Sequence, residues 1–230
     1  MPTTPTTPPF TREALERVFE RANFKAFQQP GFMSHYWAPL ISACSGSRRN
    51  EIFFLSPDDV GEKDGIGILH IKAGAASRTG SGLPSRDIPI HPTLKRLGLL
   101  DFVEARRRSH PQERLFSEYK AIQEQAGVLF SRAFVGWIKT TVSRLPEEQR
   151  QLFAADFHFP SLRALFLAEA IRTGMSEAAM RQILGTGTPV RPARTETQGQ
   201  AALAHADAEI RRLDIESYFP PLCPYQELMA

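Results

Sequence analysis

The chain has 230 residues, a formal net charge of +3 and a sequence pI near 9.0, and 42% of its residues are hydrophobic. These values are typical of a globular protein with one sizeable core. No run of about 18 apolar residues occurs, which argues against a membrane span. The two cysteines, Cys44 and Cys223, lack metal-ligand spacing. The sequence therefore predicts no metal, no cofactor and a reducing, cytoplasmic setting.

The basic residues are mostly arginine, with 22 Arg among the 28 Lys and Arg residues. Arginine presents a planar fork of donors that matches a phosphate group, so this bias suits a nucleic-acid partner. A GC-rich genome would enrich arginine equally well, and composition leaves both explanations open.

Residues 1–9 are rich in Thr and Pro and indicate a disordered tail or the stub of a linker. A first helix is expected from Thr11, whose hydroxyl is a good N-cap. A second is expected over residues 33–44, ending at Gly46, and a short third from about Arg48.

The hydrophobic period then changes. Residues 65–72 and 86–90 alternate as β-strands do, and the Gly- and Ser-rich residues 73–85 between them indicate a hairpin loop. His91-Pro92 predicts a helix start, because proline is favoured at the first helical position.

The remainder of the chain has helical periodicity with clear stop signals. Ser176 is a good N-cap, and Gly174 and Gly185 stand where C-terminal glycines belong. The expected fold is α+β, mostly helical with a small antiparallel sheet. We expect three regions: a tail (1–9), a main domain (10–197), and a C-terminal helix with a docking tail (198–230). Helices are expected at Leu100–Arg107, Ile122–Ser143, Ser161–Thr173, Glu177–Leu184 and about 198–213.

Three short segments stand out as candidates for chemistry. They are Ser-Gly-Ser-Arg-Arg-Asn-Glu-Ile (45–52), Pro-Ser-Leu-Arg (160–163) and Ile-Leu-Gly-Thr (183–186). A lone arginine at a helix start is usually a solvated surface residue. Two such segments in order, with a basic β-hairpin between them, are less easily explained by chance.

This ordered set resembles the catalytic domain of the tyrosine recombinase (phage integrase) family. Residues 45–52 are similar to the family's Thr-Gly-x-Arg-x-x-Glu box, which assigns Arg48 to the first catalytic arginine and Glu51 to the acidic position. Arg163 falls on the second catalytic arginine. Residues 86–92 resemble the family's Arg-x-Val-Pro-Leu-His-Pro segment.

The resemblance implies a three-stranded antiparallel sheet against helices and a reaction that needs no metal. In that reaction a tyrosine attacks a DNA phosphodiester while two arginines stabilise the charge on its oxygens. In that family a lysine of the β-hairpin is the general acid for the leaving oxygen, and a histidine accepts the proton of the nucleophile.

Five of the family's roles fall on residues that cannot perform them. The lysine of the hairpin falls near Gly80, and no lysine occurs between Ala73 and Thr93. The tyrosine falls at Thr195. The three remaining roles fall on Pro160, Ala164 and Thr186. His158, two residues before Pro160, could replace the first histidine. Arg78 could provide the positive charge that the family's lysine provides. Tyr218 or Tyr225 could act as the nucleophile from a displaced position.

The expected function is therefore that of a DNA-binding, cleavage-deficient member of the family, linked to DNA integration and recombination by mobile genetic elements. The predicted partner is double-stranded DNA, with self-association through the C-terminal tail as a further expectation and a bacterial, nucleoid-associated location. Two alternatives stay open: an active recombinase that uses Tyr218, and a non-catalytic interaction module. The candidate catalytic residues are Arg48, Arg163 and Tyr218, and the candidate DNA contacts are Arg48, Arg49, Arg78, Arg86 and Arg163.

Overall fold

The computed structural model describes residues 7–24, 32–74, 84–118, 125–185 and 196–228. Over these residues the chain is mostly helical and carries a small three-stranded antiparallel sheet, which confirms the α+β class. The strands are β1 (Val60–Lys63), β2 (Ile66–Ile71) and β3 (Arg86–Pro89). The α-helices are α1 (Arg12–Phe19), α3 (Met33–Ser45), α4 (Arg49–Phe53), α5 (Pro92–Arg96), α6 (Leu99–Ser109), α7 (Ala126–Arg144), α8 (Glu147–Arg150), α9 (Pro160–Arg172), α10 (Glu177–Leu184), α11 (Glu196–Ile210) and α12 (Tyr225–Leu228); short 3₁₀ turns are η1 (Pro57–Asp59), η3 (Gln151–Phe153) and η4 (Glu216–Tyr218).

Most helix ends lie where local signals predict them. The Thr11 hydroxyl accepts a hydrogen bond from the backbone of Ala14, and Ser176 does the same for Ala179. Gly46 ends α3 and Gly185 ends α10, both in the left-handed conformation. The helix expected over 198–213 covers Glu196–Ile210 instead, and the first residues of the helix expected over 122–143 lie outside the described part.

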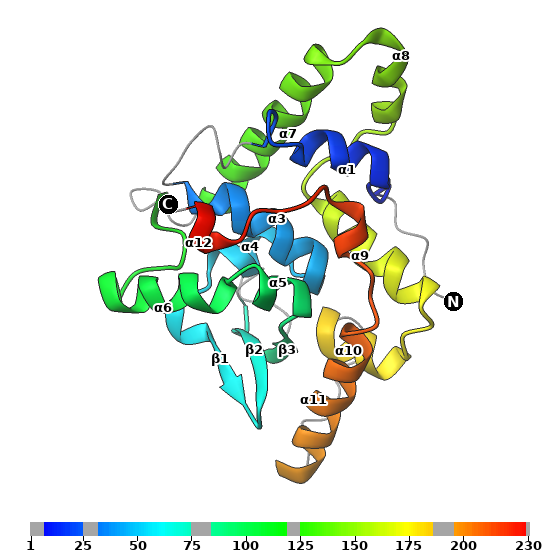
Figure 1. Ribbon diagram of the computed structural model, residues 1–230. Coiled ribbons are helices and arrows are strands. Elements are labelled where there is room, and N and C mark those ends of the chain that lie inside the picture. The colour runs from blue at the N-terminus through cyan, green and yellow to red at the C-terminus, as the bar shows by residue number, and fades with distance from the viewer. Residues whose placement is uncertain (1–6, 25–31, 75–83, 119–124, 186–195, 229–230) are drawn as a thin grey trace.

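Strand β1 is the sheet element that periodicity did not locate. Val60 is its one buried residue and the other three are exposed, so the segment has no apolar run to recognise. It pairs with β2 in antiparallel register, Val60 opposite Leu69, and β2 pairs with β3, Ile71 opposite Arg86. Helices α10 and α11 contact β3 and lie beside the sheet in Figure 1.

Helix α3 forms the centre of the core. Apart from Met33, all of its residues are buried, including the large side chains of Tyr36 and Trp37. A helix that is buried on every side needs other elements to surround it. Helix α9 packs against α3, and through this contact the segments that carry Arg48 and Arg163 are brought together.

The C-terminal tail packs on the body of its own chain. Phe219 is buried and lies edge-on to Phe19 of α1, with 4.8 Å between ring centroids. Farther on, the Tyr225 backbone donates to the carbonyl of Leu97, and the Tyr36 hydroxyl donates to the carbonyl of Cys223. The tail therefore contributes to the core of this chain, while self-association through it stays a prediction.

Gly46 fits a position that no side chain could fill. Its φ is +64°, and a Cβ atom there would lie 2.7 Å from carbon atoms of both Leu184 and Phe166. Gly174 has a similar φ of +69° but open space around it. The two glycines therefore share the backbone requirement and differ in packing.

We predict that Gly46→Ala lowers the free energy of unfolding by about 2–4 kcal/mol, combining left-handed strain with overpacking. Gly174→Ala should cost about 1 kcal/mol, because strain is its main penalty. Urea unfolding followed by circular dichroism measures both. Equal losses would show that the contacts of Gly46 with α9 and α10 are not tight.

Candidate functional site

The loop before α4 holds the first candidate arginine by a set of serine hydrogen bonds. The Ser45 hydroxyl lies 2.6 Å from the Ile41 carbonyl oxygen and 2.7 Å from the Ser47 hydroxyl, and all of these groups are buried. The Ser42 hydroxyl donates to the Ser47 carbonyl. These bonds fix the turn that leaves α3 at Gly46, so that Arg48 stands at the N-cap of α4.

Glu51 is the carboxylate that connects the arginines. One oxygen, Oε2, accepts from the backbone N–H of Arg48 at 2.7 Å. The other, Oε1, accepts from Nη2 of Arg86 at 2.9 Å and lies 3.5 Å from Nη1 of Arg48. The Glu51 side chain is only 1% exposed. A buried carboxylate needs partners of this kind, because its charge would otherwise be too costly to desolvate.

Arg86, at the start of β3, is buried with Glu51. Its Nε donates to the carbonyl of Ile183 in α10, and its Nη1 has no hydrogen-bond partner in the described structure. Burial lowers its pKa, partly offset by the charge of Glu51. The guanidinium also lies against Gly185, where a Cβ would approach it to 3.1 Å. Arg86 thus links the sheet, α4 and the end of α10.

Arg163, in the first turn of α9, joins the same cluster from the other side. Its Nη1 donates to the carbonyl oxygen of Gly46, two residues before Arg48. Burial, together with the positive charges of Arg48 and Arg86, lowers the pKa of Arg163 to about 10. The group still carries its charge at neutral pH.

Arg48 and Arg86 contact the Glu51 carboxylate, and Arg163 lies near enough for the charges of all three residues to shift its pKa. Three guanidinium groups therefore gather around one carboxylate in a partly buried setting. The Arg48 side chain is 34% exposed and forms the accessible part of the cluster. An excess of positive charge with restricted hydration favours an oxyanion such as a phosphate group. We call Arg48, Glu51, Arg86 and Arg163 the arginine cluster.

The other candidate DNA contacts lie elsewhere or outside the described residues. Arg49 donates to the hydroxyl of Ser131 at 3.1 Å, and its stem packs against Gly127, so it faces α7. Arg78 falls in the segment 75–83, outside the described part. Direct DNA contacts by Arg49, Arg78 and the internally bonded Arg86 stay predictions.

Tyr218 is engaged in a different network. Its hydroxyl donates to Oε1 of Glu169 at 2.6 Å, and the guanidinium of Arg12 lies 5.8 Å from its ring centroid. Burial and the adjacent carboxylate raise the pKa of Tyr218 to about 12. Glu169 lies six residues after Arg163 on α9, a rise of about 9 Å. The structure does not bring Tyr218 into the arginine cluster, and its hydroxyl is held in its protonated form.

The positions expected to lack catalytic groups fall in two classes. Pro160 is the first residue of α9, and Ala164 is buried one residue after Arg163. His158 lies before the helix, where its Nδ1 is 2.9 Å from the carbonyl oxygen of Asp156. Gly80, Thr186 and Thr195 lie outside the described residues.

Sequence reasoning missed Glu169 as a structural anchor. This buried carboxylate also accepts from Nε and Nη2 of Arg172, one turn later on the same helix. An acidic residue in an otherwise apolar helix, three positions before an arginine, was the available signal. It could have indicated an ion pair but not the tail residue that shares it.

The comparisons with known proteins add no identification: no family model, no curated protein and no solved structure matches the chain. Within the described segments, no helix has the length and apolar character required to cross a membrane. The same segments contain no group of three or more His, Cys, Asp or Glu side chains placed to hold a metal ion.

We predict that Glu51→Gln, which keeps the shape and removes the charge, lowers the free energy of unfolding by about 3 kcal/mol, because it leaves Arg86 buried without a counter-charge. Glu177→Gln is the matched control. Its ion pair with Arg181 is exposed, and its loss should cost less than about 1 kcal/mol. Chemical denaturation of both variants would test this, and similar losses would contradict the central role of Glu51.

Proposed function

We propose that this protein is a DNA-binding protein of the tyrosine recombinase type that no longer cleaves DNA. The observation that carries the proposal is the convergence of Arg48 and Arg163 from two distant helix starts on one partly exposed, positively charged cluster. The resemblance assigns these same two residues to the arginines that hold a DNA phosphate. The three-stranded sheet between their segments is consistent with the resemblance.

The arrangement of the cluster supports a binding role. Arg48 is partly exposed, whereas Arg86 is buried and Arg163 largely so, and both of these add positive potential. Guanidinium groups held in place by Gly46 and Glu51 are preorganised, so that binding a phosphate requires little further ordering. A single phosphodiester would accept donors from Arg48 first.

The environment of Tyr218 supports the loss of cleavage. A nucleophilic tyrosine must be deprotonated as it attacks, and a nearby carboxylate opposes that step. Tyr218 donates to Glu169 and has a raised pKa. To reach the arginine cluster it would have to leave this bond, and the tail that contains it would have to leave the core.

We predict weak duplex-DNA binding with little sequence preference, measured by fluorescence anisotropy at about 50 mM salt and weakening as salt increases. Arg48→Gln and Arg163→Gln should each weaken binding about fivefold to tenfold, since each removes a charge-assisted phosphate contact. Arg108→Gln, at an exposed residue paired with Glu104, makes the same charge change away from the cluster and should change affinity less than about twofold.

Two results would contradict the DNA-binding proposal. Absence of binding at low salt would favour the interaction-module alternative. An equal effect of Arg108→Gln would indicate that net charge, and not the cluster, governs binding. The Arg48 variant is the safer test, because Arg163 also bonds to Gly46 and its loss could alter the fold.

We predict no covalent adduct between the protein and a nicked suicide DNA substrate, assayed by denaturing gel electrophoresis. The arginines can stabilise charge on the phosphate, but attack requires a nucleophile in line with the leaving oxygen. If an adduct forms and Tyr218→Phe abolishes it while Tyr225→Phe does not, the protein is an active recombinase that uses a displaced tyrosine.

A further inference from the structure

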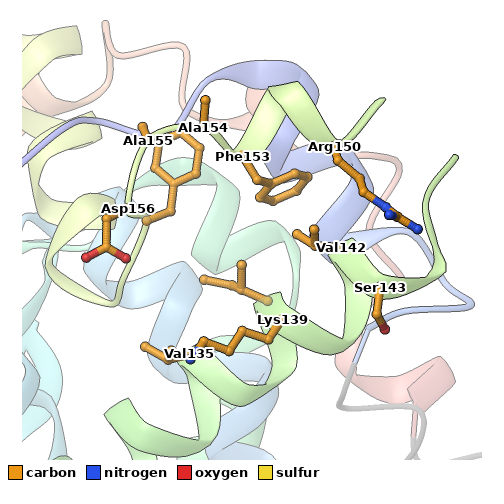
Figure 2. A pocket seen from close by; sticks show the side chains of 11 residues that line it. Val135, Lys139, Val142, Ser143, Arg150, Phe153, Ala154, Ala155 and Asp156 are labelled. Carbon is orange, nitrogen blue, oxygen red and sulfur yellow. The ribbon is translucent and has the colours of Figure 1, made fainter. Parts of the chain in front are cut away.

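A cavity separate from the arginine cluster lies between the C-terminal half of α7 and residues 150–157, at and after the end of α8. Its volume is about 560 Å³. Helices α7 and α8 extend away from the body of the molecule in Figure 1, and Figure 2 shows the cavity from close by. Pockets of roughly 300–1,000 Å³ are the size that small organic ligands occupy.

The walls of the cavity are mainly apolar. Val135, Ile138 and Val142 recur at helical spacing along α7, and Phe153 and Phe157 also line the cavity. Figure 2 shows Phe153 facing Val142. The two phenylalanine rings meet edge to face, with centroids 6.1 Å apart. Ile138 and Phe157 are buried, whereas Val135, Val142 and Phe153 remain partly exposed. Hydrocarbon placed between these walls would displace water from apolar surface, which is favourable.

Two cations line the same cavity without acidic partners. Within the described residues, neither Lys139 nor Arg150 forms an ion pair with a carboxylate, whereas exposed arginines elsewhere, such as Arg108 and Arg211, do. The Arg150 Nε donates to the carbonyl of Leu145, which fixes the stem of the side chain. In Figure 2 the guanidinium of Arg150 lies at the Ser143 end of the cavity, at the edge of the apolar walls, where it can bind an anion.

The distribution of charge favours a ligand with one anionic group at the Arg150 end of the cavity. In Figure 2, Arg150 and Ser143 lie toward one end of the cavity, and Asp156 lies toward the other. The Asp156 carboxylate would repel a second negative charge. A ligand with an anionic group at Arg150 and an apolar body along Val142, Ile138 and Phe153 is compatible with the charges at both ends of the cavity.

We propose that this cavity binds a monocarboxylate with an extended apolar body, of the kind represented by a medium-chain fatty acid. The carboxylate accepts hydrogen bonds from Arg150, Lys139 adds positive potential along α7, and the chain lies between the valines and the phenylalanines. The site shares no residue with the arginine cluster, so its ligand does not compete directly for Arg48 or Arg163.

The test uses decanoate as the probe, below the concentration at which it forms micelles, with decanol and decylamine as neutral and cationic counterparts. Isothermal titration calorimetry on the full chain should show saturable binding of one decanoate. Decanol should bind about tenfold more weakly, since it lacks a charge-assisted bond worth about that factor, and decylamine more weakly still.

Matched variants distinguish the contact of the ligand's carboxylate with Arg150 from the contacts of its apolar chain with the cavity walls. Arg150→Gln should weaken decanoate about tenfold and leave decanol unchanged. Arg144→Gln removes an exposed arginine at the end of α7 that does not line the cavity, and should leave decanoate binding unchanged. Val142→Trp should obstruct the apolar part of the cavity and weaken binding of both probes. Circular dichroism confirms that each variant is folded.

The proposal is wrong if decanoate shows no saturable binding, if decylamine binds as tightly as decanoate, or if Arg144→Gln weakens binding as much as Arg150→Gln. Equal affinity for decanoate, decanol and decylamine would indicate an apolar contact surface that does not select an anion. Arg48→Gln should bind decanoate as the wild-type chain does, so that failure of the DNA-binding proposal and failure of this one are distinguishable.

Discussion

The buried carboxylate of Glu51 is the interaction on which the arrangement of the arginine cluster depends. It caps the start of α4 through the Arg48 backbone and neutralises Arg86, which in turn bonds to the carbonyl of Ile183. Three elements distant in sequence, α4, β3 and α10, are thereby fixed to each other. A buried ion pair contributes little net stability against an apolar replacement, but removing one partner is costly. We infer that this carboxylate serves chiefly to set the geometry of the arginines.

A second buried carboxylate, Glu169, holds the C-terminal tail in place. It receives the hydroxyl of Tyr218 and the guanidinium of Arg172, while Phe219 inserts into the core beside α1. Helix α9 therefore carries a residue of the arginine cluster at its start and the anchor of the tail near its end. This placement separates Tyr218 from the cluster, and it is the physical basis for proposing a protein that binds DNA without cutting it.

Arg163 and Arg150 differ in their charge pairing from several other arginines of the described structure. Arg107 and Arg108 pair with Glu104 on their own helix, and Arg211, just after α11, pairs with Asp207 of that helix. Arg163 bonds to a backbone carbonyl, and Arg150 does so too. A guanidinium held by a neutral carbonyl keeps its charge uncompensated, which suits it to an external anion. The two proposed sites share this feature although they lie on different elements and would select different ligands.

The sequence by itself determined the positions of most helices and two of the three strands, because the signals for them are local. Caps such as Thr11 and Ser176 and glycines such as Gly46 and Gly185 act within a few residues of the chain. It also identified Arg48 and Arg163 as a pair, by resemblance. Tertiary structure alone decided that Arg86 is buried on Glu51, that Tyr218 is bound to Glu169, and that α7 and residues 150–157 leave a cavity. Each of these depends on contacts between residues far apart in sequence, and no periodicity or cap encodes which distant partner a side chain will meet.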